Sequence, residues 1–254
     1  MSRVGAVAAP VVVGVAGLAA WEAVVTLGRV APFVLPAPSV IGEQFWTSRE
    51  VIWRTALASG ANALVGLVIG SVFAVLAALV ASRFPPVHRL WTPILAVLNA
   101  LPIIAVAPLL NNAYESTSSL PRRLVVALVV FFPVFLNTLR GLTEVDPTHL
   151  ELMRAYAATG TQVSRFLRFP GAVGYLCVGL RQASALSVIA AVVSEYFGGL
   201  QDGLGSRITS AAANTAYPRA WAFVLGACAL GLLFYLVTLL IERLATPWQR
   251  RHAA

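Results

Sequence analysis

Long stretches without a charged residue restrict what this chain can fold into. Residues 55–82 carry no charge over their whole length, and neither do residues 220–241. A helix needs roughly 20 residues to cross the hydrocarbon core of a bilayer. Only 11% of all residues are charged, against about 25% in an ordinary soluble domain. We therefore expect a helical membrane protein.

The uncharged stretches predict an all-α, polytopic membrane protein with about six transmembrane helices. We assign all residues, 1–254, to one membrane domain, because no soluble domain or internal repeat is apparent. Within the second stretch, Gly66 and Gly70 stand four residues apart and predict a smooth face for close helix packing. The six expected spans are residues 4–21, 55–82, 90–114, 124–139, 172–194 and 220–241.

The arginines predict the orientation. An even number of spans places both termini on one side of the membrane, and that side would hold ten arginines against seven on the other. Because basic residues are enriched in cytoplasmic loops, both termini are expected in the cytoplasm. The arginines are spread among loops instead of forming one patch, so nucleic-acid binding is not expected.

The longest polar segment, residues 144–170, would then be cytoplasmic. Asp146 followed by Pro147 is typical of a helix start, with aspartate as the cap and proline in the first turn. A helix-turn-helix outside the membrane is therefore expected. Its elements are a helix over residues 150–156, a turn over 157–160 and a second helix over 161–169 that ends at Pro170.

This segment resembles the EAA loop of bacterial binding-protein-dependent importer permeases. The family pattern is roughly Glu-Ala-Ala-Arg-Ser-x-Gly followed, a dozen residues on, by Leu-Pro. The matching positions here are Glu151, Arg154, Gln162, Phe169 and Pro170. The resemblance implies the type I ABC importer permease fold, in which this loop couples the permease to a separate ATPase.

The turn of the loop departs from the family pattern. Ala157 stands where the family has glycine, and Gly160 follows three residues later. We therefore expect the turn to form around Gly160, so both residues join the expected coupling set. Leu152 and Met153 replace the two alanines, and Asn111 to Tyr114 replace an aromatic, glycine-rich stretch of the family; the effect of these changes is left open.

Further short motifs resemble the branch that imports sulfonates, taurine, nitrate and thiamine-pyrimidine precursors. The motifs are Trp21-Glu22, Leu35-Pro36-Ala37-Pro38-Ser39, Leu101-Pro102, Phe131-Phe132-Pro133, Asn137-Thr138, Gly179-Leu180-Arg181 and Gly203-Leu204-Gly205. The resemblance implies a small polar or anionic solute in a bacterial inner membrane. It also implies three kinds of partner: two copies of an ABC ATPase, an extracytoplasmic solute-binding protein, and a second permease in a homodimer or heterodimer.

The chain is not expected to be an enzyme. It has no Gly-x-x-x-x-Gly-Lys-Ser/Thr phosphate loop, so ATP and magnesium are expected on the partner ATPase. No cofactor or metal site is expected on this chain. The alternative is a stand-alone secondary transporter or channel. Such proteins normally carry carboxylates inside their spans or inverted repeats. Apart from Glu22 at the boundary of the first span, none of the expected spans contains a carboxylate, and no internal repeat is apparent.

A few polar residues lie in or near the expected spans. Arg181 is the most informative, because an unpaired charge at the bilayer centre costs at least about 2.5–3.5 kcal/mol. It either lines the translocation path or forms a structural pair, and we favour the pair. Glu195 and Asp202, at the expected outer mouth, either meet a binding protein or cap a short helix. The candidates for the path are Asn99, Asn137, Arg181, Gln182 and Ser184.

Overall fold

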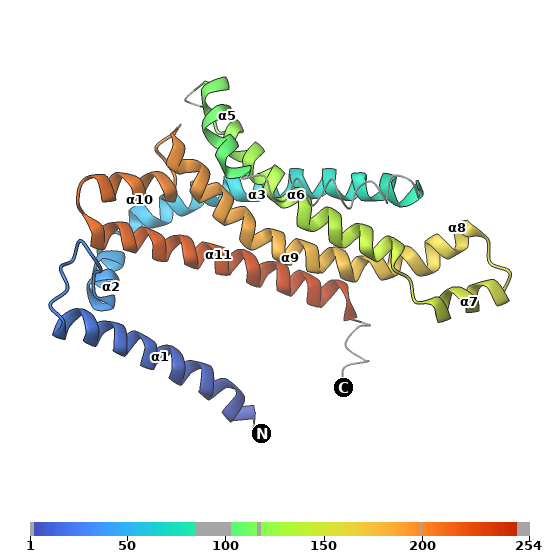
Figure 1. Ribbon diagram of the computed structural model, residues 1–254, viewed down its shortest axis with the longest axis horizontal. Coiled ribbons are helices and arrows are strands. Elements are labelled where there is room, and N and C mark those ends of the chain that lie inside the picture. Colours follow the sequence, from blue (N-terminus) through green and yellow to red (C-terminus); the bar gives the residue numbers. More distant parts are fainter. Residues whose placement is uncertain (1–2, 85–102, 116–117, 199, 248–254) are drawn as a thin grey trace.

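The computed structural model describes residues 3–84, 103–115, 118–198 and 200–247, and these ranges contain helices and no strands (Figure 1). The helices, in chain order, are α1 (Arg3–Leu27), α2 (Pro38–Thr47), α3 (Arg49–Arg83), η1 (Ile103–Val106), α5 (Ala107–Ala113), α6 (Leu120–Thr143), α7 (Pro147–Ala155), α8 (Gly160–Val163), η2 (Ser164–Arg168), α9 (Phe169–Ser194), η3 (Glu195–Phe197), α10 (Leu204–Ala213) and α11 (Tyr217–Ala245). The all-α prediction is confirmed.

Five of the six expected spans correspond to helices long and apolar enough to cross a membrane. They are Ala8–Leu27 in α1, all of α3, all of α6, the stretch Gly160–Phe197 that contains α9, and all of α11. The third expected span, residues 90–114, falls largely on residues 85–102, which lie outside the described residues. Its last part forms η1 and α5, and Pro108 stands in the first turn of α5.

The centre of the molecule is formed by α3, α6 and α9, which lie side by side (Figure 1). A Cβ added at Gly66 would lie 2.5 Å from the Cβ of Val126, and one added at Gly70 would meet the backbone of Ala127. The two helix backbones can approach because these positions of α3 have no side chain. Ala74 and Ala78 continue the same face and are completely buried. The predicted smooth face is confirmed.

Helix α1 lies apart from this centre (Figure 1) and is almost entirely exposed. It is attached to α2 through Glu22, whose carboxylate accepts hydrogen bonds from the Ser39 hydroxyl at 2.7 Å and from the Ser39 N–H at 3.0 Å. Since the first amides of a helix have no partner within the helix, Glu22 completes the start of α2 from a neighbouring helix.

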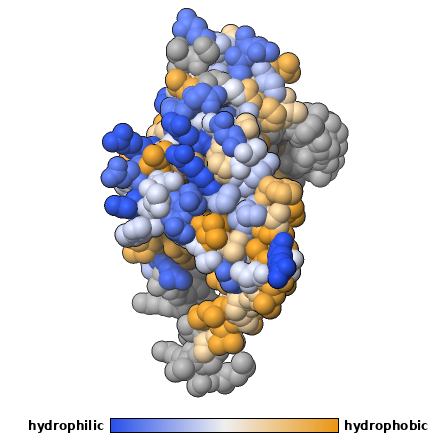
Figure 2. Space-filling view, turned by 90° about the vertical axis from the view of Figure 1, so that its left-hand side faces the viewer, coloured by the Kyte–Doolittle hydropathy of each residue, from blue (hydrophilic) through white to orange (hydrophobic). Residues whose placement is uncertain are grey.

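One end of the molecule is formed by α2, α10 and the connection between α1 and α2. Figure 2 views the molecule from this end and shows hydrophilic residues gathered beside a hydrophobic region. Exposed polar residues of this end include Arg207, Thr209, Ser210 and Asn214 on and after α10. The opposite end of Figure 1 is formed by α7 and α8. The spans therefore connect two polar ends, as expected of a membrane protein.

Candidate functional site

The segment between α6 and α9 contains the expected pair of short helices at the end of the molecule (Figure 1). Asp146 caps α7, because its carboxylate accepts the N–H of Thr148 at 2.8 Å. This backbone hydrogen bond holds the pKa of Asp146 below its ordinary value. At α8, the Thr159 hydroxyl and the Gln162 side chain form a capping box. Gln162, matched to the family by sequence, thus has a local structural role.

The turn between these helices is centred on Ala157 and not on Gly160. Ala157 has a φ of +51°, in the left-handed region that costs an L-residue with a side chain about 1–2 kcal/mol. Gly160 is the first residue of α8 and does not have a positive φ. The expectation that the turn formed around Gly160 was therefore wrong. The left-handed residue occupies the position where the family pattern has glycine.

The sequence predicted that the second helix ends at Pro170, and this prediction is wrong. It passes through the π-helical turn η2 into α9, and Pro170 falls in the first turn of α9. In η2 the N–H of Phe169 bonds to the carbonyl of Ser164, five residues earlier. A π turn widens the helix locally, and proline lacks the N–H that a regular turn would use. The helical stretch Gly160–Phe197 therefore joins the exposed loop directly to a membrane span.

The loop presents exposed apolar side chains. Leu152 is 53% exposed, Tyr156 77% and Phe166 64%. The expected coupling residues lie among these side chains and are also exposed: Glu151, Arg154, Ala157, Gly160, Gln162, Phe169 and Pro170. Isolated apolar residues are common on protein surfaces, but a group on a polar segment outside the span is typical of an interaction site.

A hollow of about 400 Å³ lies between α6 and α9. Asn137 and Gln182 line it, and the Asn137 amide donates to the Pro133 carbonyl at 2.8 Å and to the Gln182 side-chain oxygen at 3.4 Å. Arg140 also lines the hollow. Of the candidates for the path, Asn137 and Gln182 are therefore brought together, in a space that a small solute could enter.

The remaining candidates for the path lie elsewhere. The Arg181 guanidinium is 3.0 Å from the Glu242 carboxylate of α11, which is the structural pair that the sequence analysis favoured. Ser184 is completely buried, and its hydroxyl is 3.0 Å from that of Thr238, also on α11. Arg181 and Ser184 therefore join α9 to α11. Asn99 lies outside the described residues.

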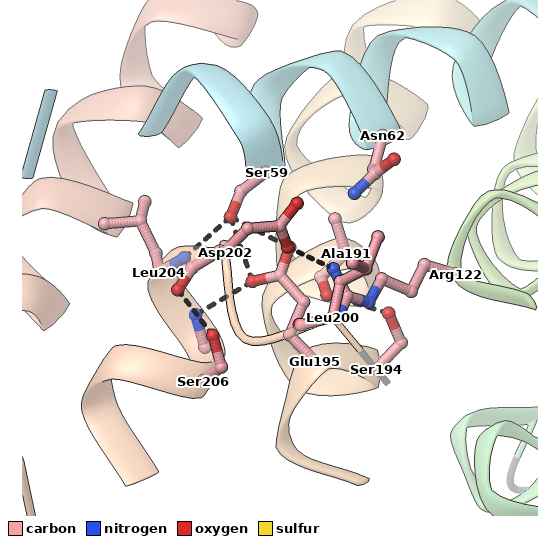
Figure 3. A network of polar contacts seen from close by, with 12 residues as sticks. Ser59, Asn62, Arg122, Ala191, Ser194, Glu195, Leu200, Asp202, Leu204 and Ser206 are labelled. Carbon is pink, nitrogen blue, oxygen red and sulfur yellow. Dashed lines mark hydrogen bonds and ion pairs between the residues drawn. The ribbon is translucent and has the colours of Figure 1, made fainter. Parts of the chain in front are cut away.

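A polar network lies at the α10 end of the molecule, opposite to α7 and α8 (Figure 3). Glu195 is only 1% exposed, and its carboxylate accepts from the Ser59 hydroxyl at 2.9 Å and from the N–H of Gly205 at 2.8 Å. The Ser59 hydroxyl also accepts the N–H of Leu204 at 2.9 Å. Glu195 and Ser59 together cap α10. Of the two alternatives for Glu195, the helix cap is correct, because a buried carboxylate cannot contact a binding protein.

An arginine completes the network. Arg122 is 1% exposed; it donates to the Asp202 carboxylate at 2.7 Å and to the Leu200 carbonyl. Asp202 itself is 48% exposed. Glu195, the first residue after α9, thus joins α3 to the start of α10, and Arg122 of α6 holds the segment that precedes α10.

Sequence reasoning missed four residues. Arg140 follows Asn137 by three residues, and this helical spacing could have placed both on the face that lines the hollow. Arg122 was counted only as a loop charge, and Ser59 and Glu242 gave no sequence signal, because their partners are 136 and 61 residues away along the chain. Among the described residues, no three His, Cys, Asp or Glu side chains are grouped as a metal site would require.

The sequence is similar to those of known proteins. The profile of a family described as "Binding-protein-dependent transport system inner membrane component" matches residues 66–251. The riboflavin transport system permease protein of Chloroflexus aurantiacus is 28% identical over 231 residues, covering 90% of this chain and 85% of that protein. The formylaminopyrimidine transport permease protein of Halalkalibacterium halodurans is 29% identical over 223 residues, covering 87% of this chain and 88% of that protein.

A solved structure shows the same fold. The crystal structure of an amino acid ABC transporter with histidines superposes with a TM-score of 0.60 at 15% sequence identity, covering 81% of this chain and 95% of the other.

Proposed function

The chain belongs to the family of binding-protein-dependent transport system inner membrane components and is a permease subunit of an ABC importer, and on this premise we propose how it couples and what it carries. Its relatives are importer permeases, which favours this function over a stand-alone secondary transporter or channel. We further propose that it works with an ATPase carrying ATP and magnesium, an extracytoplasmic binding protein and a second permease.

The coupling surface is proposed to be α7 and α8 with their connecting turn. The observation that carries this proposal is the continuity of the helical stretch Gly160–Phe197, which begins at the exposed loop and ends beside Glu195. Two ATPases, one on each permease, would grip α7, α8 and the adjoining π turn η2 through Leu152, Tyr156 and Phe166. Because helix α9 continues from α8, a rotation of the loop would move the span that lines the hollow.

Co-purification tests the coupling surface. The full chain is co-expressed with its proposed ABC ATPase partner and purified from membranes by an affinity tag. The substitutions Leu152→Asp and Tyr156→Asp place charge on the exposed apolar surface and should abolish ATPase recovery. The control is Leu128→Asn on α6, which is 45% exposed but remote in sequence from the loop. Undiminished ATPase recovery with the two loop variants would exclude α7 and α8 as the docking surface.

The carried solute is proposed to be small and polar or anionic, of the sulfonate, nitrate or pyrimidine-precursor type. The two relatives described above are named for riboflavin and formylaminopyrimidine. The hollow supports a small polar or anionic solute, since its polar lining residues are Asn137, Gln182 and Arg140. A guanidinium suits an anionic group, because it donates several hydrogen bonds in a fixed plane.

Transport into proteoliposomes tests the path. The assembled importer is supplied with its binding protein and with candidate solutes of matched size, one anionic and one neutral. Arg140→Gln should lower uptake of the anionic solute at least tenfold, by about 1.4 kcal/mol or more, and leave uptake of the neutral solute within about twofold. An equal loss for both solutes would assign Arg140 to the structure and not to solute selection.

The orientation is also part of the proposal. Both termini and the loop from α7 to α8 would be cytoplasmic, and the end with α2 and α10 would face the binding protein. The excess of arginines on the proposed cytoplasmic side supports this orientation.

A further inference from the structure

A second hollow, of about 430 Å³, lies where α3 ends beside the π turn η2. It is separate from the hollow between α6 and α9 and shares no lining residue with it. Its residues are Leu79, Val80, Ser82, Arg83, Phe84, Leu142, Ser164, Arg168 and Phe169. Apart from Phe169, which belongs to the expected coupling set, these residues have no role in the transport function proposed above.

The hollow carries positive charge without a balancing carboxylate. Arg83 and Arg168 both line it, and no aspartate or glutamate does. None of the ion pairs between described residues includes either arginine. The Nε atom of Arg168 is buried and has no hydrogen-bond partner among the described residues. Buried donors are nearly always paired, so this Nε atom is an unsatisfied donor on one of the two arginines that line the hollow.

The remaining lining is apolar and lies at the membrane boundary. Arg83 is the last residue of the span formed by α3, so its guanidinium is at the depth of lipid headgroups. Val80 is 60% exposed, Phe84 56% and Phe169 44%. A free phosphate would leave this apolar wall exposed to water, whereas an acyl chain would cover it.

We propose that this hollow binds an anionic phospholipid of the cytoplasmic leaflet, with its phosphate between Arg83 and Arg168. The acyl chain lies against Val80, Phe84 and Phe169. Basic pockets between membrane helices on the cytoplasmic side are suited to such headgroups. The assignment to the cytoplasmic leaflet rests on the orientation proposed above. The bound lipid joins the end of α3 to η2, the turn through which the proposed coupling surface continues into α9.

Native mass spectrometry of the full chain in detergent tests the proposal without any partner subunit. The chain is titrated with phosphatidylglycerol and, separately, with phosphatidylcholine of the same acyl chains. Phosphatidylglycerol adducts should be retained at lower lipid concentration. Arg83→Gln and Arg168→Gln should each weaken phosphatidylglycerol binding about fivefold. The control is Arg165→Gln, on the same π turn but outside the hollow, and it should leave binding unchanged.

Three outcomes would overturn the proposal. Equal retention of the two lipids would remove the headgroup preference, and equal weakening by all three glutamine variants would reduce it to general surface charge. Competition by millimolar inorganic phosphate would assign the site to the free anion. Because the wild-type comparison needs no variant, a misfolded substitution does not block the test. Because it needs no ATPase or solute, its failure is distinct from failure of the proposed transport function.

Discussion

At the scale of single residues, Ala157 has the most unusual backbone of the proposed coupling loop. Its φ of +51° is a conformation that glycine adopts without cost. Family resemblance had suggested that the turn follows the nearest glycine along the chain. The backbone instead keeps the left-handed residue at the family position, and the residue there bears the strain.

We predict that Ala157→Gly stabilises this turn by about 1 kcal/mol, because it removes the clash of the Cβ atom. Ala157→Val should open the turn, because a β-branched residue tolerates this conformation least. Hydrogen exchange of the amides in residues 150–162 measures both effects. The matched control is Gly160→Val, which should exchange like the wild type, since a Cβ at Gly160 would meet nothing within 4 Å. Faster exchange for Gly160→Val than for Ala157→Val would place the turn at Gly160.

The buried network at the other end also depends on single positions. A Cβ on Gly205 would contact the backbone carbonyl of Val192 and would lie 2.8 Å from the Cβ of Glu195. The Gly203-Leu204-Gly205 motif therefore leaves room for the carboxylate that caps α10. This explains the motif as packing around Glu195.

We predict that Gly205→Ala lowers the free energy of unfolding by about 1–3 kcal/mol, as overpacking typically does. Thermal unfolding in detergent, followed by tryptophan fluorescence, measures the change. Gly42→Ala on α2 is the matched control at the same end, because its added Cβ would meet nothing within 4 Å, and it should be neutral or slightly stabilising. Equal melting temperatures for the two variants would contradict the packing role.

At the scale of elements, α9 is held to α11 by two polar contacts one turn apart. Arg181 pairs with Glu242, and Ser184 contacts Thr238. The side chains of Arg181 and Glu242 are 29% and 18% exposed, so the pair is only partly shielded from its surroundings. This geometry makes Arg181 a link between two spans, whereas the path candidates Asn137 and Gln182 face the hollow.

We predict that Arg181→Glu lowers transport strongly, because two carboxylates would then face each other between α9 and α11. The double variant Arg181→Glu with Glu242→Arg should restore at least half of the wild-type uptake, since the pair is re-formed with its charges exchanged. Uptake of solute into proteoliposomes at equal protein content measures the rescue. A double variant as inactive as the single one would instead support contact between Arg181 and the solute.

At the scale of the whole molecule, the sequence predicted what depends on hydrophobic length and local pattern. Uncharged stretches located five spans that the structure describes, and Asp146 with Pro147 located the start of α7. The sequence did not predict features that depend on contacts between residues far apart along the chain. Pro170 was expected to end a helix because proline lacks an N–H. The π turn η2 instead accommodates the missing hydrogen bond, and the helix continues into α9. Glu195 was left with two alternatives because Ser59 lies 136 residues away. Its burial appears only when α3, α9 and α10 meet.

The proposed orientation leads to a prediction for the whole molecule. In a variant whose cysteines, Cys177 and Cys228, are replaced by alanine, single cysteines are introduced as Tyr156→Cys and Asn214→Cys. Both positions are exposed at opposite ends of the molecule. In intact cells, a membrane-impermeant maleimide should label the cysteine at 214 and leave the one at 156 unlabelled, because the cytoplasmic side holds the excess of arginines. Permeabilised cells provide the control, since both cysteines should then react. Labelling of 156 but not 214 in intact cells would reverse the orientation, and with it the side from which the ATPase and the anionic lipid reach the chain.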